Sequence, residues 1–133
     1  LGLGLNPRLS LAARLNLSAL LLQRGALEEA SRLCEAAVRL SPEVALGWYN
    51  IGMIRRRQGD IAGALEAYAT ARQLAPDHAE THQNLAAAQL LGGNIEAARG
   101  SFRTAIALLR QQGRANEADR LRQQAGAIVK LGA

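Results

Sequence analysis

The sequence predicts an all-α protein, built as a solenoid of repeated helix-turn-helix segments with a capping helix at its C-terminal end. The composition favours helices, because Ala and Leu dominate a chain that is 49% hydrophobic and only 3% aromatic, and β-branched residues are scarce. A short pattern also recurs. One Asn interrupts an apolar stretch three times, at Asn16, Asn50 and Asn84, with successive copies 34 residues apart. A fixed period of this length is typical of stacked repeats.

Many other residues share this period. Within each repeat the apolar residues recur every three or four positions, so each repeat is expected to form two helices. A single helix pair cannot bury both of its faces, and three repeats must therefore stack to form a continuous core. The recurring columns are Gly25, Gly59 and Gly93; Ala30, Ala64 and Ala98; Cys34, Tyr68 and Phe102; Ala37, Ala71 and Ala105; and Leu40, Leu74 and Leu108.

Turn and cap signals predict where the helices begin and end. The glycines mark the turn inside each repeat, so the first helix should end at Gln23 or Arg24. Asp60 and Asn94 are placed to cap the second helices of the second and third repeats.

The first helices carry a different start signal. Ser41 before Pro42, and Asn6 before Pro7, are expected to supply an N-cap and a first-turn proline. The third repeat has no closing proline, so its second helix is expected to continue until Gly113 breaks it.

The chain divides into three parts on this basis. Residues 1–8 resemble the tail of a preceding segment, residues 9–112 hold three repeats (about 9–42, 43–76 and 77–112), and residues 113–133 hold the capping helix. An apolar stripe with a polar back predicts that helix over 116–131. The start of the chain shows no comparable cap and no initiator Met, which indicates a piece of a longer protein. The stripe consists of Ala118, Leu121, Ala125, Ile128 and Val129.

The three repeats, from about Ser10 to Gln112, resemble the tetratricopeptide repeat family. The resemblance is strongest in the middle repeat. The family's period is also 34 residues, although Arg14 and His82 stand where the motif expects the Trp of the middle repeat. The resemblance implies a right-handed superhelix whose first helices line a concave groove. The residues that match the motif are Trp48, Ile51, Gly52, Gly59, Ala64, Tyr68, Ala71 and Pro76.

The recurring Asn predicts a peptide-binding groove. Its neighbours at helical spacing lie outside the small-residue columns, so the stripe around it should be exposed or half-exposed. An Asn amide can pair with the N–H and C=O of an extended backbone, and three such rungs would hold roughly six to ten residues at about 3.3 Å each. The resemblance supports this reading, since asparagine ladders are known in the family. The alternative is that each Asn bonds the adjacent repeat and sets the stacking.

Other residues of the same surface are candidates for ligand contact. Tyr49 and Met53, with Arg56 and Arg57, are placed to accept an acidic or aromatic side chain. The alternative for the arginines is a solvated helix end. Gln23 and Glu80 lie on the stripe of the first and third repeats and complete the predicted peptide-binding set.

Several classes of function find no support in the sequence. The net charge of +5 is spread along the chain, unlike the continuous basic face of nucleic-acid-binding proteins. The longest uncharged stretch, Thr81 to Ile95, is too short to cross a membrane. His78 and His82 have no evident third metal ligand and are expected at the surface, while Cys34 is expected to be a small buried hydrophobe. No catalytic residue, cofactor or metal is predicted.

The sequence therefore predicts a protein-interaction scaffold that binds a protein or peptide partner. Two alternatives stay open: an accessory substrate-recruiting domain of a larger enzyme of glycosyltransferase or sulfotransferase type, and a homo-oligomer formed through the uncapped N-terminal end. The preference for Arg over Lys suggests a bacterial source. The compartment is left open, with the cytoplasm favoured.

Overall fold

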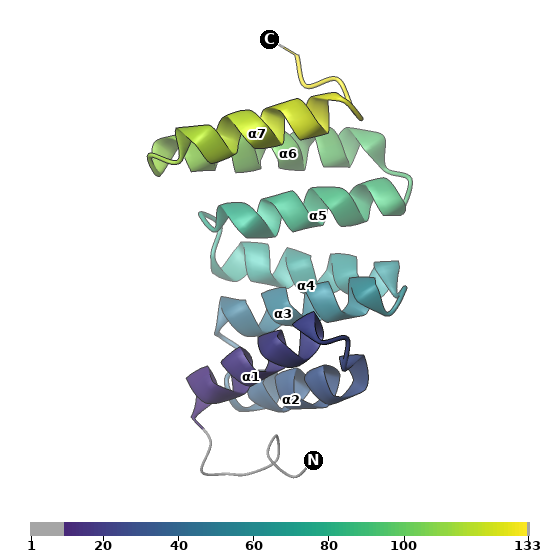
Figure 1. Cartoon of the computed structure of the whole chain (residues 1–133), viewed down its shortest axis with the longest axis vertical. Helices are drawn as coiled ribbons and strands as arrows, with labels where there is room; N and C mark the ends of the chain where they lie inside the picture. Colours follow the sequence, from purple (N-terminus) through teal and green to yellow (C-terminus); the bar gives the residue numbers. More distant parts are fainter. Residues whose placement is uncertain (1–9, 133) are drawn as a thin grey trace. The chain divides into compact units, whose positions relative to one another are not determined.

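The computed structural model describes residues 10–132, which contain helices and no strand (Figure 1). The predicted all-α fold is confirmed. Within this range no helix is both long enough and apolar enough to cross a membrane. The helices are α1 (Leu11–Gln23), α2 (Leu27–Leu40), α3 (Ala45–Arg57), α4 (Ile61–Leu74), α5 (Ala79–Leu91), α6 (Ile95–Gln111) and α7 (Ala115–Gly126).

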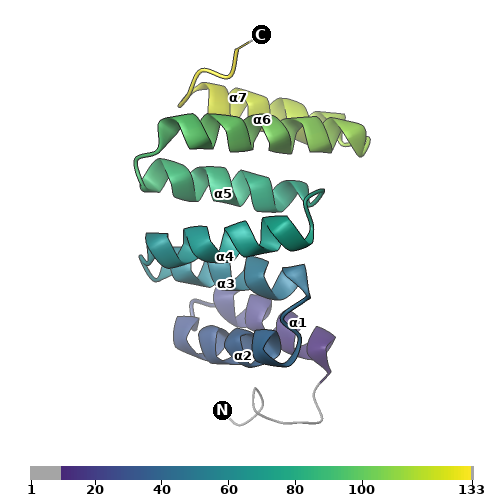
Figure 2. The same cartoon turned by 180° about the vertical axis from the view of Figure 1, so that it is seen from behind.

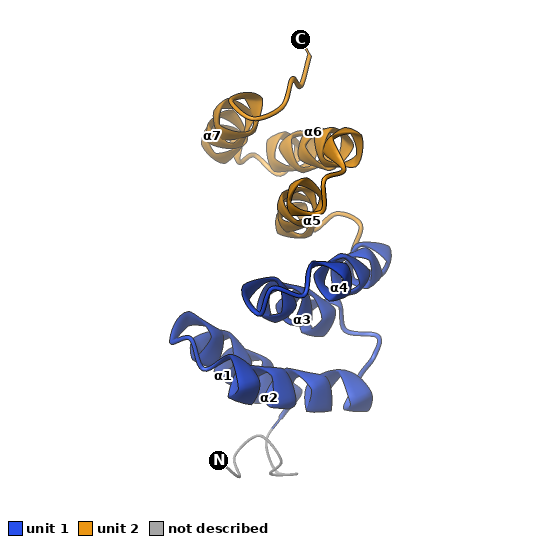
Figure 3. Ribbon diagram, turned by 90° about the vertical axis from the view of Figure 1, so that its right-hand side faces the viewer, with its two compact units in different colours: residues 1–74 blue, residues 75–133 orange. Residues whose placement is uncertain are grey.

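The helices belong to two compact units, residues 1–74 and 75–133 (Figure 3). Unit 1 contains two helical hairpins, α1 with α2 and α3 with α4. Unit 2 contains the hairpin of α5 with α6, and α7 packs against α6.

In unit 1 the first helices of the two hairpins, α1 and α3, lie on one side, and α2 and α4 lie on the other (Figures 1 and 2). A close approach of α3 to α4 depends on Gly52. A Cβ atom at this position would lie 2.5 Å from the ring of Tyr68, which is fully buried. The main apolar cluster of the unit consists of Leu15, Leu22, Ala30, Cys34, Ala37, Val38, Ile51, Ile54 and Ala67.

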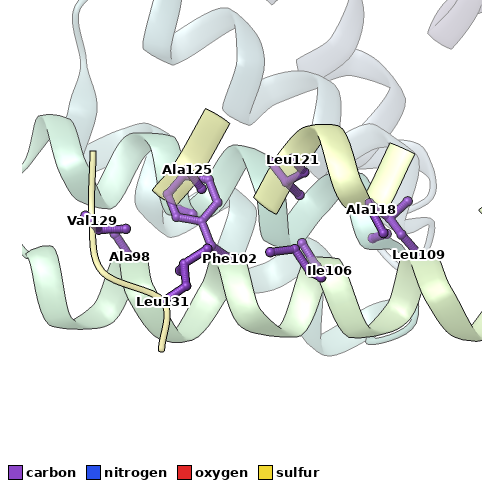
Figure 4. Close-up of a cluster of buried hydrophobic side chains, with 12 residues drawn as sticks. Ala98, Phe102, Ile106, Leu109, Ala118, Leu121, Ala125, Val129 and Leu131 are labelled. Atoms are coloured by element: carbon purple, nitrogen blue, oxygen red, sulfur yellow. The ribbon is translucent and has the colours of Figure 1, made fainter. Parts of the chain in front are cut away.

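In unit 2 the long helix α6 forms the centre of the core. It has 17 residues, against 14 in α2 and in α4, and it ends just before Gly113, whose φ is +75°. The predicted extension of this helix is confirmed. One cluster joins α5, α6, α7 and the residues that follow α7 (Figure 4), and it includes Ala86, Ala98, Phe102, Ala105, Ile106, Leu109, Ala118, Leu121, Ala125, Val129 and Leu131.

The predicted caps of the second helices are confirmed. The Asp60 carboxylate accepts a hydrogen bond from the backbone N–H of Gly63 at 2.9 Å, and the Asn94 side chain accepts one from Ala97 at 3.1 Å. These bonds satisfy donors that an uncapped helix end would leave open. The predicted turn glycines are also in place, with φ of +79° at Gly25 in the first hairpin.

The predicted start of α3 at Ser41 and Pro42 is wrong. Ser41 instead ends α2, since its N–H bonds the Ala37 carbonyl at 2.9 Å, and α3 begins at Ala45. The indole of Trp48 donates to the Pro42 carbonyl at 2.8 Å, so residues 42–44 are held as a turn outside the helix.

The corresponding signal at Asn6 and Pro7 lies outside the described residues. Helix α1 is capped by Ser10, whose hydroxyl accepts from the N–H of Ala13 at 3.1 Å.

The capping helix is shorter than predicted. Helix α7 ends at Gly126, and Ile128, expected on its apolar stripe, is 68% exposed. Val129 and Leu131 are buried all the same, because the chain after α7 runs back over the apolar cluster of unit 2 (Figure 4).

Candidate peptide-binding surface

The three recurring asparagines do not lie in equivalent environments. Asn16 on α1 is exposed, Asn84 on α5 is partly buried, and Asn50 on α3 is 3% exposed. The expectation of an exposed or half-exposed stripe is therefore wrong at Asn50, the middle asparagine.

Asn50 joins the two hairpins of unit 1. Its Nδ2 lies 3.4 Å from the carbonyl oxygen of Leu15 and 3.4 Å from the hydroxyl of Ser18, both on α1. The Ser18 hydroxyl itself donates to the Leu15 carbonyl at 2.8 Å. A buried amide must find partners on folding, and these bonds set where α3 sits along α1. Asn50 therefore follows the alternative interpretation, in which the amide bonds the adjacent repeat and sets the stacking.

The rest of the predicted stripe is accessible. On α1 the side chain of Gln23 is exposed, and on α3 Leu46 is 45% exposed while Met53 is half-buried. The prediction of an exposed or half-exposed surface holds for these positions. In unit 1 they form a mixed polar and apolar face on α1 and α3, which we call the α1–α3 face: Ala12, Asn16, Ala19, Gln23, Leu46, Tyr49, Met53 and Arg57.

Arg57 at the edge of this face is partly committed to structure. Its Nη1 donates to the Leu22 carbonyl in the last turn of α1 at 3.1 Å, where the helix dipole favours a cation. The guanidinium has further N–H groups, and the residue is exposed.

Arg56 and Tyr49 both lie near Tyr68. Burial raises the pKa of the Tyr68 phenol to about 12, and the neighbouring Arg56 guanidinium opposes that shift in part. The rings of Tyr49 and Tyr68 are tilted, with centroids 6.1 Å apart. Tyr49 and Arg56 are half-buried, so they offer a ligand only part of their surface.

Glu80 is not free for a ligand. Its Oε2 lies 2.6 Å from Nη2 of Arg114, and its Oε1 lies 3.3 Å from Nη1 of the same guanidinium. Arg114 also donates to Glu117 at 2.6 Å. The hydrogen bonds from Arg114 lower the pKa of the Glu80 carboxyl. This pair joins the first turn of α5 to the start of α7, and the prediction of Glu80 as a peptide contact is corrected accordingly.

The histidines are structural. The prediction of two surface residues is wrong for His82, which is 6% exposed and has its Nε2 2.8 Å from the Pro76 carbonyl. His78 precedes α5, with its Nδ1 2.7 Å from the Thr81 hydroxyl. Within residues 10–132 no group of three His, Cys, Asp or Glu residues is arranged to hold a metal ion.

Cys34 is the small buried hydrophobe that was predicted. It is fully buried, and burial raises the pKa of its thiol to about 12. The thiol lies 3.2 Å from the Gly47 carbonyl, so it is a packing residue and a weak nucleophile.

Two features of unit 2 escaped the sequence analysis. One is the Arg114–Glu80 pair. The other is a set of three arginines, Arg99, Arg103 and Arg122, that hold the carbonyls of the residues after α7. The available signal was a pair of arginines one helical turn apart, Arg99 and Arg103, followed later by apolar residues at two alternate positions, Val129 and Leu131.

The geometry is that of a helical-repeat protein. Helical hairpins stack with small residues at the contacts between helices, and the first helices present an accessible face. The sequence profile of the family described as tetratricopeptide repeat matches residues 43–111, about half of the chain. The chain belongs to the tetratricopeptide repeat family.

Two relatives match part of the chain. Protein FlbA of Caulobacter vibrioides is 33% identical over 91 residues, which cover 68% of this chain and 15% of FlbA. The mouse protein O-mannosyl-transferase TMTC1 is 35% identical over 77 residues, covering 58% of this chain and 8% of TMTC1. The chain thus spans only a small part of either relative.

Among solved structures, the fold is similar to the Yersinia enterocolitica type III secretion chaperone SycD in complex with a peptide of the translocator YopD. The TM-score is 0.81 at 20% identity, over 92% of this chain and 96% of SycD. At this identity the likeness concerns the fold.

Proposed function

We propose that the chain is a protein-interaction scaffold that binds an extended segment of a partner protein on the α1–α3 face. The observation that carries the proposal is that apolar side chains of this face stay accessible beside an exposed amide, with Leu46 45% exposed and Asn16 exposed. A peptide complex of a protein with a similar fold, SycD, supports the same kind of ligand.

Each part of the face has a chemical role in this proposal. The Asn16 amide pairs with one N–H and one C=O of the ligand backbone. Leu46 and Met53 receive apolar side chains, and burial of their exposed surface on binding supplies affinity. Arg57 pairs with an acidic side chain through the N–H groups that do not bond Leu22. Gln23 adds a polar contact at the end of α1.

In unit 1 the proposal now rests on one asparagine, Asn16, instead of a ladder of asparagines. Asn50 is excluded because its amide is buried against α1. Asn84 on α5 stays a candidate for the same role in unit 2, and Glu80 does not.

A matched pair of substitutions tests the proposal. Leu46 on α3 is 45% exposed and Leu74 on α4 is 41% exposed, so Leu46→Glu and Leu74→Glu make the same change at similar exposure on the two sides of unit 1. Peptides of about ten residues, which extend to about 33 Å at about 3.3 Å each, are selected from a random library on the wild-type chain. Their affinity is then measured by fluorescence anisotropy.

We expect Leu46→Glu and Asn16→Ala each to weaken the selected peptides by about tenfold, which is about 1.4 kcal/mol, while Leu74→Glu leaves the affinity unchanged. Peptides that bind equally well to all three variants would show that the ligand sits elsewhere and would overturn the proposal. Circular dichroism of each variant checks that the helices are retained.

Self-association through α1 is a second candidate, and one observation favours it. Leu20 on α1 is 44% exposed, whereas Ile54, 34 residues later on α3, is 1% exposed. Helix α3 uses this position to pack on the preceding hairpin, and α1 presents the same position to solvent. If two copies join here, light scattering across a dilution series will show a dimer that Leu20→Glu abolishes. A monomer at all concentrations would exclude this candidate.

A role as an accessory domain is a third candidate, because the chain matches only 15% of FlbA and 8% of TMTC1. The complete gene decides this point. A catalytic domain in the same reading frame would support it, and its absence would remove it.

A further inference from the structure

Residues 129–132 lie on unit 2 after the turn that ends α7, in which the N–H of Val129 still bonds the Ala125 carbonyl at 2.8 Å. Val129 and Leu131 are 5% and 7% exposed, while Ile128 between α7 and the buried pair is 68% exposed and Lys130 is exposed. Beyond the turn, exposed Lys130 separates the buried Val129 and Leu131, which is the alternation expected of extended backbone on an apolar surface. Figure 4 shows Val129 beside Ala98 and Leu131 beside Phe102, and all four residues belong to one cluster.

Three arginines hold the backbone of this segment at successive carbonyl groups. Arg99 on α6 donates from its Nε to Lys130. Arg103, one turn further along α6, donates from its Nε to Leu131 at 2.7 Å, and Arg122 on α7 donates from its Nη2 to Gly132 at 2.7 Å. Bonds to the backbone do not depend on the side chains that the segment carries, so the same donors can hold another segment of similar shape.

The segment does not use the charge of the site. Arg99 also bonds Glu96, but among residues 10–132 no carboxylate forms an ion pair with Arg103 or Arg122. A guanidinium bonds a carboxylate more strongly than a neutral carbonyl, so an acidic segment would match the site better than the present one.

The segment also leaves space at the site. An open hollow of about 360 Å³ lies beside it, lined by Arg122, Gly126, Lys130, Leu131 and Gly132. Three of these five residues belong to the segment itself, so its displacement would open the hollow toward Arg122 and Gly126 on α7.

We propose that this surface of α6 and α7 is a second binding site, which takes an extended acidic segment of a partner protein with two apolar residues separated by one, and that residues 128–132 occupy it until the partner displaces them. A tethered segment competes at an effective concentration on the order of millimolar. A partner segment must therefore bind better than the native one, and its acidic residues supply that advantage.

The test uses the full chain with Val129→Asn and Leu131→Asn, which places polar amides in the apolar cluster and releases the segment without adding a carboxylate. The probe is a fluorescent peptide with the sequence of residues 127–132 in which Lys130 is replaced by Glu. Ile128→Asn is the control, because it places the same polar side chain in the same segment at an exposed position.

We expect the probe to bind the released variant at least tenfold more tightly than it binds the wild type or the Ile128→Asn control. The peptide with the native Lys should bind more weakly than the probe, and added salt should narrow the difference between them. A released variant that keeps its helices by circular dichroism but binds the probe no better than the wild type would overturn the proposal.

A second measurement does not depend on the folding of the released variant. A fluorophore attached through Lys130→Cys reports the motion of the segment in an otherwise wild-type chain, since Cys34 is buried. An excess of unlabelled probe should lower the anisotropy of the label as the segment is displaced. No change at millimolar probe would show that the segment is a fixed cap and would overturn the proposal.

Discussion

Helices α1 and α3 carry Asn at the same position of the repeat, and the two asparagines lie in different environments. Asn50 is buried and bonds the Leu15 carbonyl, whereas Asn16 is exposed. The neighbouring position repeats the contrast, with Ile54 buried and Leu20 44% exposed. The difference follows from the neighbours, because α3 packs on a preceding hairpin within unit 1 and the corresponding side of α1 faces solvent. A recurring residue therefore has no single role in this chain.

The largest expected effect comes from truncating Ile54, the buried counterpart of Leu20. Ile54→Ala should lower the free energy of unfolding by about 2–5 kcal/mol, because it leaves a cavity between α1 and α3. Leu20→Ala should cost about 1 kcal/mol or less, because that side chain is half in solvent already. Urea denaturation followed by the fluorescence of Trp48, the single Trp of the chain, measures both. Equal losses would remove the contrast between the two helices.

The asparagines give the next largest effect. Asn50→Ala should lower the free energy of unfolding by about 1–3 kcal/mol, since it removes a buried donor to Leu15 and Ser18. Asn16→Ala should change it by no more than about 0.5 kcal/mol, as expected for an exposed helical position. The same urea titration provides the comparison, and a loss at Asn16 as large as that at Asn50 would contradict it.

The smallest expected effect is on the pH dependence of stability, which distinguishes the two units. In unit 1 the neutral amide of Asn50 joins α3 to α1, whereas in unit 2 the Glu80–Arg114 ion pair joins the first turn of α5 to the start of α7. Because the folded state lowers the pKa of Glu80, this stabilisation is present above the ordinary carboxyl pKa of about 4.3 and is lost as the pH falls through the lowered value. Acid should therefore weaken the wild type more than Glu80→Gln.

Thermal melting by circular dichroism between neutral and acidic pH measures this difference. Glu66→Gln, which changes an exposed carboxylate on α4, is the control and should follow the wild type. A Glu80→Gln variant with the same acid sensitivity as the wild type would show that the pair contributes nothing.

Features set by local sequence could be predicted. The hairpins, the caps at Asp60 and Asn94, and the turn at Gly25 depend on residues within one turn of each other, where backbone conformation and side-chain bonding decide the outcome. The long α6 followed from the missing proline for the same reason.

Features set by contacts between distant residues could not be predicted. The repeat aligned Asn16, Asn50 and Asn84, but which amide is buried depends on the helix that packs on it. The Glu80–Arg114 pair joins residues 34 positions apart, and nothing near Glu80 in sequence marks its partner. The end of α7 was missed because Ile128 and Val129 continue the helical spacing of Leu121 and Ala125, whereas the helix ends at Gly126 and Ile128 is exposed.

The exchange of the side-chain amide hydrogens of Asn50 and Asn16, followed by NMR in the wild-type chain, tests the central contrast most directly. If Asn50 joins the hairpins, its amide hydrogens will exchange with solvent much more slowly than those of Asn16, which will exchange at the rate of an exposed amide. Equal and fast exchange at both residues would contradict the account, because Asn50 would then be as open to solvent as Asn16.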